Sequence, residues 1–520
     1  MTLAWTQDKP RIRRFFVVVR WLPALAAAAY LATVAVLGPE LVRDVGWDTD
    51  VSGPLVLAER LRGSGPVFIP HYGEWTSLWW LLATRSLPWH AQLWEATGYV
   101  FAVTAAVLLG WATARVAGKW AGVTAAAAAL VVGPFALRSL LTVALHVTNS
   151  FTAAVLGVAL VLLTRTRSRS LAVAVGLLAG ANAASDPLLW IAGIVPFALA
   201  AALLARTTRR LDVALRAAVT LGVTIVSAVA TNLLMHGLGF HVVGLTIGLA
   251  PVHDLPANTL HLGRMVALLG GANYALPGGY PREPLRALLA LLVLAAVVAP
   301  VAAAVKLTVR RAEPTAQAYA CYWGAASILL CVIFVITPNA AALGPDSVNY
   351  LLTLALAAGT GVALLAARSS RVQLAVALAI VVAGAINIAG IARGHAEIYA
   401  TNPIRTYEPP LVRLLERKGV TRGYAGYWDA QNITWQSGMR LLIAPVQRCA
   451  AQLCPYNFFT IRSWYEPHPG PTFLLLDASN RFIPAAPRFV GGARATYRLG
   501  PLTVYLFDYD IARHIRLPAT

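Results

Sequence analysis

The acidic residues that follow the first apolar stretch are the side chains best placed for catalysis. Asp44, Asp48 and Asp50 lie close together in one short segment. A carboxylate at a membrane boundary can act as a general base toward a hydroxyl group, because partial burial raises its pKa toward neutrality. Asp48 and Asp50 could instead share a divalent cation through their oxygen atoms. A hydrated acidic loop without a chemical role is the third alternative, since Asp-x-Asp spacing is a weak signal.

The same loop continues with His71 and Glu74. These two residues could bind a substrate, or they could be interfacial hydrogen-bonding residues. Residues 75–82 are rich in tryptophan and form a segment too short to cross a bilayer. Indole rings prefer the headgroup region. We therefore expect this segment to be an interfacial helix, preceded by an amphipathic helix at 52–62.

Several cationic side chains elsewhere are candidates for binding a substrate. Arg138 follows the third predicted span, and its alternative role is to reach toward lipid headgroups. The cationic candidates are Arg138, His261, Arg264 and Arg282. His261 also shares a loop with His236, His241 and His253, but their spacing matches no standard zinc motif.

Asp186 lies in the sequence Ser185-Asp186-Pro187 between two apolar runs. A charge at the centre of a membrane helix costs several kcal/mol, so we expect a turn here. Asp186 could cap the helix that follows, or it could contribute to an active site. His146 and Asn149 lie near the end of a neighbouring span. A polar contact between helices is their simpler role, and His146 is also a candidate substrate-binding residue.

The composition shows which elements must position these side chains. Of 520 residues, 58% are hydrophobic and 12% are charged, and the mean hydropathy is +0.65. Soluble domains carry about 25% charged residues, so a soluble or disordered protein is excluded. A polytopic, all-α membrane protein is predicted. Its eleven apolar spans are expected at 16–38, 93–116, 120–137, 142–163, 171–185, 187–205, 213–235, 285–305, 315–337, 349–367 and 373–392.

The charge distribution orients these spans. The formal net charge is +20, and basic residues occupy every turn on the side of the N-terminus. The positive-inside rule therefore predicts a cytoplasmic N-terminus and an extracytoplasmic C-terminal segment. The basic excess is then an orientation signal and not a nucleic-acid-binding surface. Only four of the 42 basic residues are lysines, a bias typical of GC-rich bacterial genomes, so we expect a bacterial plasma membrane and contacts with its lipids.

We expect two domains. Residues 1–392 form the membrane domain, with extracytoplasmic loops at 39–92 and 236–284, and residues 393–520 form a small α/β domain. Cys449 and Cys454 lie in this second domain, and a disulfide between them is plausible in an oxidising compartment. Helices are expected after the prolines of the 404–418 segment, with Gly419 as terminator, and at 429–437. Strands are expected at 422–427, 440–446, 472–477 and 502–507.

The order of these features resembles the GT-C superfamily of integral membrane glycosyltransferases. One span leads to an acidic loop with two interfacial helices, and many spans precede an outer C-terminal domain. Residues 423–434 are also similar to a segment of uncharacterised bacterial members. The resemblance implies a polyprenyl-phosphate-linked sugar donor, and the candidates to stabilise its departing phosphate are then Arg138, His261, Arg264 and Arg282. It implies a glycan or glycolipid acceptor, whose site His71 and Glu74 would help to shape. It also implies a base or metal-binding role for Asp48, with Asp50 as the second choice.

Two motifs found in members of that superfamily are absent from this chain, and their absence limits which activity and which donor contacts we expect. The chain lacks the Trp-Trp-Asp motif of oligosaccharyltransferases, which disfavours that activity. Residues 349–351 read Asn-Tyr-Leu where family members often carry an Arg-Tyr-Leu-like segment, so a donor-phosphate arginine is missing there. No cofactor is certain from the sequence, and a divalent cation remains open.

Two other functions compete with a glycosyltransferase. A transporter or flippase of a lipid-linked intermediate would need polar or broken helices at mid-bilayer, and the spans are nearly free of charge there. A scaffold whose outer domain binds a glycan or a partner enzyme is the third hypothesis. A pump driven by ATP within this one chain is disfavoured because no Walker motif is present.

Overall fold

The computed structural model describes residues 21–37, 49–61, 65–70, 75–141, 146–243, 248–272, 284–338, 344–397, 403–450, 452–477 and 490–517. The chain divides into two compact units. The helical unit comprises Met1–Pro39, Thr97–Thr231 and Thr246–Gly394. The mixed unit comprises Glu40–Ala96, Asn232–Leu245 and His395–Thr520. The predicted division near residue 392 stays a prediction. The mixed unit also includes nearly all of the first long loop and the start of the second, whose remainder belongs to the helical unit.

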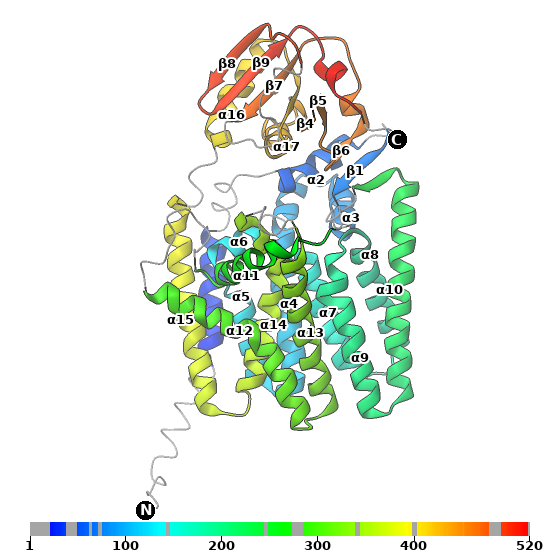
Figure 1. The fold of residues 1–520 in the computed structure, drawn as a ribbon, viewed down its shortest axis with the longest axis vertical. Helices are drawn as coiled ribbons and strands as arrows, with labels where there is room; N and C mark the ends of the chain where they lie inside the picture. The colour runs from blue at the N-terminus through cyan, green and yellow to red at the C-terminus, as the bar shows by residue number, and fades with distance from the viewer. Residues whose placement is uncertain are drawn as a thin grey trace, which may run out of the picture. The chain divides into compact units, whose positions relative to one another are not determined.

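Helices make up the helical unit (Figure 1). A first helix, Trp21–Leu37, precedes the numbered elements. Those in or running through this unit are α4 (His90–Ala117), α5 (Lys119–Leu130), α6 (Pro134–Leu141), α7 (Val147–Leu162), α8 (Arg169–Ser185), η1 (Trp190–Ile194), α9 (Val195–Thr208), α10 (Leu211–Gly237), η2 (Val252–Asp254), α11 (Leu255–Leu269), α12 (Pro284–Val309), α13 (Pro314–Ile336), η3 (Gly344–Leu351), α14 (Leu352–Ala366) and α15 (Ser370–Glu397).

The expected polytopic architecture is confirmed. Among the described residues, seven helices are long and apolar enough to cross a membrane, and three shorter apolar helices accompany them. The predicted number of eleven spans stays a prediction. Large apolar side chains on the surface of α10, such as Val226 and Leu233, remain exposed, as expected for a helix surrounded by lipid.

The predicted span at 120–137 is wrong as one continuous helix. α5 ends at Leu130, and a separate short helix, α6, begins at Pro134. Proline lacks the amide hydrogen that would continue the first helix, whereas it is well tolerated at a helix start. The Gly133 amide donates instead to the Leu269 carbonyl at the end of α11, over 2.7 Å. α11 itself was not among the expected elements.

Small residues allow the helices of this unit to approach closely. A methyl group added at Gly176 of α8 would meet the Thr220 carbonyl oxygen of α10, and one added at Gly180 would overlap Ser227. The Ser227 hydroxyl donates to the Leu177 carbonyl of α8 over 2.9 Å. Such i,i+4 pairs of small residues are a common device for packing helices in membranes.

A six-stranded sheet forms the centre of the mixed unit, with order β5-β4-β3-β7-β9-β8. β3, β4 and β7 are parallel to one another, and the outer pairs are antiparallel. The bounds are β3 (Arg422–Ala425), β4 (Leu442–Cys449), β5 (Gln452–Pro455), β7 (Thr472–Asp477), β8 (Ala495–Leu499) and β9 (Leu502–Phe507), with helices α16 (Pro403–Arg417) and α17 (Tyr427–Gln436) and the short helices η4 (Arg462–Tyr465) and η6 (Ile511–His514). The predicted small α/β domain is confirmed.

A second, three-stranded sheet joins three distant parts of the chain. Its order is β2-β1-β6, with β2 (Phe240–Val243), β1 (Val67–Pro70) and β6 (Thr460–Ile461). The same unit contains the two helices expected in the first loop, α2 (Thr49–Arg60) and α3 (Trp75–Thr84). α2 packs on α17, and Arg60 donates to the Met439 carbonyl over 2.8 Å.

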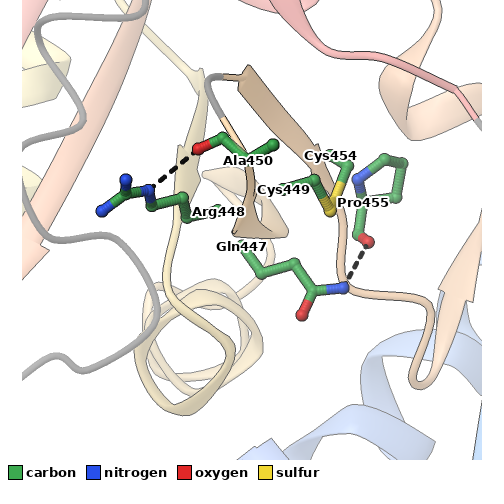
Figure 2. The surroundings of a disulfide bond; sticks show 6 residues. All are labelled: Gln447, Arg448, Cys449, Ala450, Cys454 and Pro455. Carbon is green, nitrogen blue, oxygen red and sulfur yellow. Dashed lines mark hydrogen bonds between the residues drawn. A yellow bond between two sulfur atoms is a disulfide. The ribbon is translucent and has the colours of Figure 1, made fainter.

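The hairpin of β4 and β5 carries the predicted Cys449–Cys454 disulfide (Figure 2). Arg448 Nε donates to the Ala450 carbonyl over 3.0 Å, and Gln447 Nε2 donates to the Pro455 carbonyl over 3.3 Å. The turn itself bends through Ala450, which has a positive φ of 53°. The covalent link therefore closes a tight turn between the two strands.

Candidate functional site

The carboxylate of Asp186 is the centre of a buried polar cluster in the helical unit. Only 2% of this residue is exposed. Its Oδ2 atom accepts a hydrogen bond from Asn149 Nδ2 over 2.6 Å and lies 2.5 Å from His146 Nδ1. Its Oδ1 atom accepts from the Leu188 amide over 3.0 Å. Both carboxylate oxygens of Asp186 therefore make polar contacts. Oδ1 contacts the local turn, and Oδ2 contacts side chains at the start of α7.

Local sequence explains where Asp186 lies. α8 ends at Ser185, and Asp186 takes an extended conformation while its amide still donates to Asn182. The proline that follows cannot continue α8, so the chain turns and starts the next helical segment. The hydrogen bond from Leu188 caps that segment. The structure thus shows the capping contact together with a polar contact to His146 and Asn149.

His146 is held from two sides. It precedes α7 in a left-handed conformation, with φ of 73°, which is uncommon for residues other than glycine. Its ring lies 4.7 Å, centroid to centroid, from the ring of Tyr350 in η3. A strained backbone and a bond to a buried carboxylate both constrain the direction of the imidazole, a feature that is frequent at functional sites.

Further polar side chains surround this cluster. Asn182 Nδ2 donates to Thr152 Oγ1 over 2.5 Å, and the hydroxyls of Ser150 and Thr353 lie 3.0 Å apart. Among the described residues, Asn149 Oδ1 and Thr148 Oγ1 are buried without a hydrogen-bond partner. Buried polar atoms are normally satisfied, so these two are exceptions within the cluster.

Of the cationic candidates, His261 has a defined environment. Its Nε2 atom lies 2.9 Å from Ser347 Oγ, and its ring stacks on Phe334 with centroids 5.8 Å apart. Ser347 belongs to η3, which also carries Tyr350. Arg264 is exposed. η3 therefore links the neighbourhoods of His146 and His261 within one unit.

The remaining candidates are described only in part or not at all. Asp48, His71, Glu74 and Arg282 lie outside the described residues. Asp50 lies in the first turn of α2 and Arg138 lies in α6, but their side chains are not among those described. Their assigned roles, including a shared cation at Asp48 and Asp50, stay predictions.

Histidines of the second long loop do not form a metal centre among the described residues. His236 and His241 have ring centroids 4.8 Å apart, and burial together with His236 lowers the pKa of His241. His253 is exposed and pairs with Asp254 over 3.5 Å.

Sequence reasoning missed Tyr350 and Ser347 as members of the site. In the sequence, residues 349–351 stand out only because an arginine is missing there. The available signal was the run Gly344-Pro345, which breaks an apolar stretch and allows the polar side chains of η3 to precede α14.

The expected GT-C fold is confirmed by comparison with solved structures. ArnT from Cupriavidus metallidurans, solved in the apo state, aligns with a TM-score of 0.54 at 12% identity, over 93% of this chain and 98% of ArnT. The Archaeoglobus fulgidus oligosaccharyltransferase, solved in complex with Zn and sulfate, aligns with a TM-score of 0.50 at 14% identity.

That second alignment covers 88% of this chain and 68% of the oligosaccharyltransferase, so the chain spans about two thirds of the archaeal enzyme. No protein-family model and no curated protein sequence matches the chain. At these identities the comparisons establish the shared fold.

Proposed function

We propose that this chain is a membrane glycosyltransferase that transfers a sugar from a polyprenyl-phosphate-linked donor to an envelope glycan or glycolipid. The observation that carries the proposal is the buried cluster of Asp186, His146 and Asn149 within an apolar helical unit of GT-C fold. Ionisable groups inside membrane domains are costly, and they commonly mark substrate sites. The expected orientation, with the mixed unit outside a bacterial plasma membrane, is part of the proposal.

In the proposed reaction, an acceptor hydroxyl attacks the anomeric carbon of the donor sugar. The bond from that carbon to the phosphate oxygen breaks, and polyprenyl phosphate leaves with the bonding electrons. Asp48, or Asp50 as the second choice, accepts the proton of the hydroxyl. Arg138, His261, Arg264 and Arg282 are the candidates to stabilise the phosphate, while His71 and Glu74 are assigned to the acceptor site.

We assign Asp186 and His146 to substrate binding. The carboxylate accepts from the imidazole and from the Asn149 amide, so it determines which way both side chains face. Such oriented groups are effective because their geometry does not have to reorganise when the substrate binds. Asp186 is therefore a positioning residue for His146 and Asn149.

The test is transfer from a panel of polyprenyl-phosphate-linked sugars by the purified full chain in nanodiscs. We expect Asp48→Ala or Asp50→Ala to reduce kcat by about 100-fold or more, since a general base contributes about 10²–10⁴-fold. Asp186→Asn should mainly raise KM for the donor. Full activity in both single variants and in the double variant of Asp48 and Asp50 would refute the assigned chemistry.

Asp508→Asn provides a matched control for the loss of an aspartate. Asp508 is exposed and pairs with Arg494 over 2.7 Å on the surface of the mixed unit. Surface ion pairs contribute little to stability, so this variant should retain wild-type transfer. An equal loss in Asp508→Asn and Asp186→Asn would mean that a general effect of charge removal explains both.

A further inference from the structure

Several arginine side chains lie together at the end of the helical unit opposite to the polar cluster of Asp186. His146, which contacts Asp186, precedes α7, and Arg165 follows the other end of that helix. α7 has 16 residues, and a helix rises by about 1.5 Å per residue, so its two ends are about 24 Å apart. The arginines therefore lie at a different place from the candidate functional site.

Hydrogen bonds bring these arginines together from three parts of the chain. Arg165 Nη2 donates to the Arg115 carbonyl, in the last turn of α4, over 2.9 Å. Arg210, immediately before α10, donates from Nη1 to the Thr164 carbonyl over 3.3 Å. Cationic side chains commonly bind carbonyls at the ends of helices in this way. The turn after α7 therefore contacts both the end of α4 and the start of α10.

The carboxylates of this region already have donors of their own. Asp212 accepts from Arg210 Nε over 3.1 Å and from Arg216 Nη2 over 2.9 Å. Glu313 accepts from the Ala316 amide over 3.0 Å at the start of α13. Within the described part of the chain, neither carboxylate forms an ion pair with the arginines that end α4 or follow α7. Positive charge at those two helix ends is therefore not neutralised by the described residues.

Arg115 and Arg165 form an exposed arginine pair. The Arg115 guanidinium lies over the ring of Trp111, 5.2 Å from its centroid, and this cation–π contact holds it beside the indole. Among the described residues, the Arg115 guanidinium donates to no acceptor, and Arg165 uses only its Nη2 atom. Both guanidinium groups therefore retain hydrogen-bond donors for an anion at the surface.

An exposed apolar stripe on α4 leads to this pair. Val100, Val107 and Trp111 are 55%, 60% and 37% exposed, and Arg115 follows Trp111 by four residues. Residues seven and four positions apart share a face of a helix. α4 is also one of the helices that are long and apolar enough to cross a membrane. One face therefore carries apolar side chains along its length and a cation at its end, which matches a lipid with an acyl chain and an anionic headgroup.

A phosphate group is the anion that suits the arginine pair. Guanidinium groups donate through parallel N–H groups to phosphate oxygens, and basic pockets between membrane helices bind anionic headgroups. Indole rings favour the headgroup region, so Trp111 places the pair at the depth of lipid phosphates. Further exposed arginines in the turns after α7 and α9 add to the positive charge: Arg167, Arg169, Arg206 and Arg209.

We propose that the ends of α4 and α7 bind the headgroup of an anionic phospholipid, with its phosphate between Arg115 and Arg165 and an acyl chain along the stripe of Val107 and Val100. A free phosphate ion would leave that stripe unused, so a membrane lipid is the expected occupant. Since the two arginines come from different helices, the bound headgroup links α4 to α7. The inference is independent of the proposed sugar transfer.

The test is lipid binding to the purified full chain in a neutral detergent, measured by native mass spectrometry. The probes are dioleoylphosphatidylglycerol, which is anionic, and dioleoylphosphatidylcholine, which is zwitterionic. We expect the wild type to bind the anionic lipid about tenfold more tightly or better. Arg115→Gln combined with Arg165→Gln should weaken that binding about tenfold or more, since each basic side chain near the headgroups attracts anionic lipid.

Arg115→Gln alone should weaken binding about threefold or more. This single variant tests the inference even if the double variant does not fold, because the Arg115 guanidinium makes no hydrogen bond to the described residues. Arg368→Gln combined with Arg371→Gln is the matched control, since it removes two exposed arginines where α14 and α15 meet. The control should bind the anionic lipid as the wild type does.

Three results would overturn the inference. Equal losses in the two double variants would mean that overall charge attracts the lipid. Wild-type binding in Arg115→Gln, or equal affinity of the wild type for both lipids, would show that the arginine pair is not a lipid site. Millimolar inorganic phosphate should leave the bound lipid in place, and complete displacement by it would assign the pair to a free anion.

Discussion

The two oxygens of Asp186 have different roles. Oδ1 accepts from the Leu188 amide where one helix ends and the next starts, and Oδ2 contacts His146 and Asn149, 40 and 37 residues earlier in the chain. Removing the carboxylate would leave the donors of both partners buried without an acceptor. An unsatisfied buried donor costs about 1–3 kcal/mol, so the cluster is important for folding as well as for the proposed binding role.

A double-mutant cycle should show that His146 and Asp186 act together. We expect His146→Ala and Asp186→Ala each to lower the melting temperature in detergent, and the double variant to lower it by clearly less than the sum. Residues that share a hydrogen bond typically show coupling of about 0.5–3 kcal/mol. Additive effects in the cycle would contradict a direct bond between the two side chains.

His241 should make the mixed unit sensitive to acid. Burial, followed by the neighbouring His236, lowers the pKa of His241 in the folded state. The unfolded chain therefore binds a proton at His241 more readily than the folded chain does. The free energy of unfolding is at its full value above the unfolded pKa of about 6.5 and decreases as the pH falls through that value. Thermal melts of the wild type between pH 8 and pH 5 should show this decrease, and His241→Gln should flatten it. An equally steep pH dependence in His241→Gln would assign the effect to other groups.

Packing between α8 and α10 depends on two glycines one turn apart. Added methyl groups at Gly176 and Gly180 would overlap backbone and side-chain atoms of α10. The close approach also allows the hydrogen bond from Ser227 to the Leu177 carbonyl. In lipid, where apolar burial drives helix association weakly, such close contact supplies much of the attraction.

Gly180→Val should therefore destabilise the helical unit. Overpacked positions typically cost about 1–3 kcal/mol, so the melting temperature in detergent should fall by several degrees. Gly222→Ala is the matched control, because Gly222 lies in α10 and a methyl group added there would meet no atom within 4 Å. Alanine is the better helix former, and this control should melt at the wild-type temperature or slightly above it. A loss in Gly222→Ala as large as that in Gly180→Val would contradict the packing argument.

The mixed unit is assembled from segments that lie far apart in the chain. β1 pairs in parallel with β2 and antiparallel with β6, and α2 packs on α17. A side chain at Gly53 of α2 would meet Gln431 of α17 and the ring of Phe459. α2, the helix that carries Asp50, therefore packs closely on α17, the helix that begins with Tyr427 and Trp428.

Gly53→Val should therefore impair both stability and the proposed transfer. The added side chain forces α2 away from α17, which would displace Asp50, and small displacements of a catalytic group can cost about 100-fold in rate. Gly237→Ala is a control in the same unit, because a methyl group added at Gly237 would project into open space. Transfer activity and melting temperature are the two measurements. Wild-type transfer activity and melting temperature in Gly53→Val would show that the position of α2 does not depend on this close contact with α17.

Patterns within short segments predicted the local elements well. The strands at 472–477 and 502–507 match β7 and β9, since their apolar residues are continuous and turns bound them. The helix expected after the prolines of the 404–418 segment is present as the last part of α16, which begins earlier, at Pro403, and includes Pro409 and Pro410. Gly419 follows it with a positive φ of 66°, as its predicted terminating role requires. These features depend on neighbours within a few residues, which the sequence displays directly.

Patterns within short segments of sequence could not predict the contacts between distant segments. β1, β2 and β6 are each at most four residues long, too short to have a distinctive period, and each becomes a strand only through its partner. The pairing of Asp186 with His146, and the ring of Tyr350 against it, likewise arise from the way helices pack. The sequence by itself determined a multi-pass helical protein with an α/β domain, because hydropathy and local turn chemistry are properties of single segments. Only the tertiary structure decided which polar residues meet, because that depends on the register and packing of elements far apart in the chain.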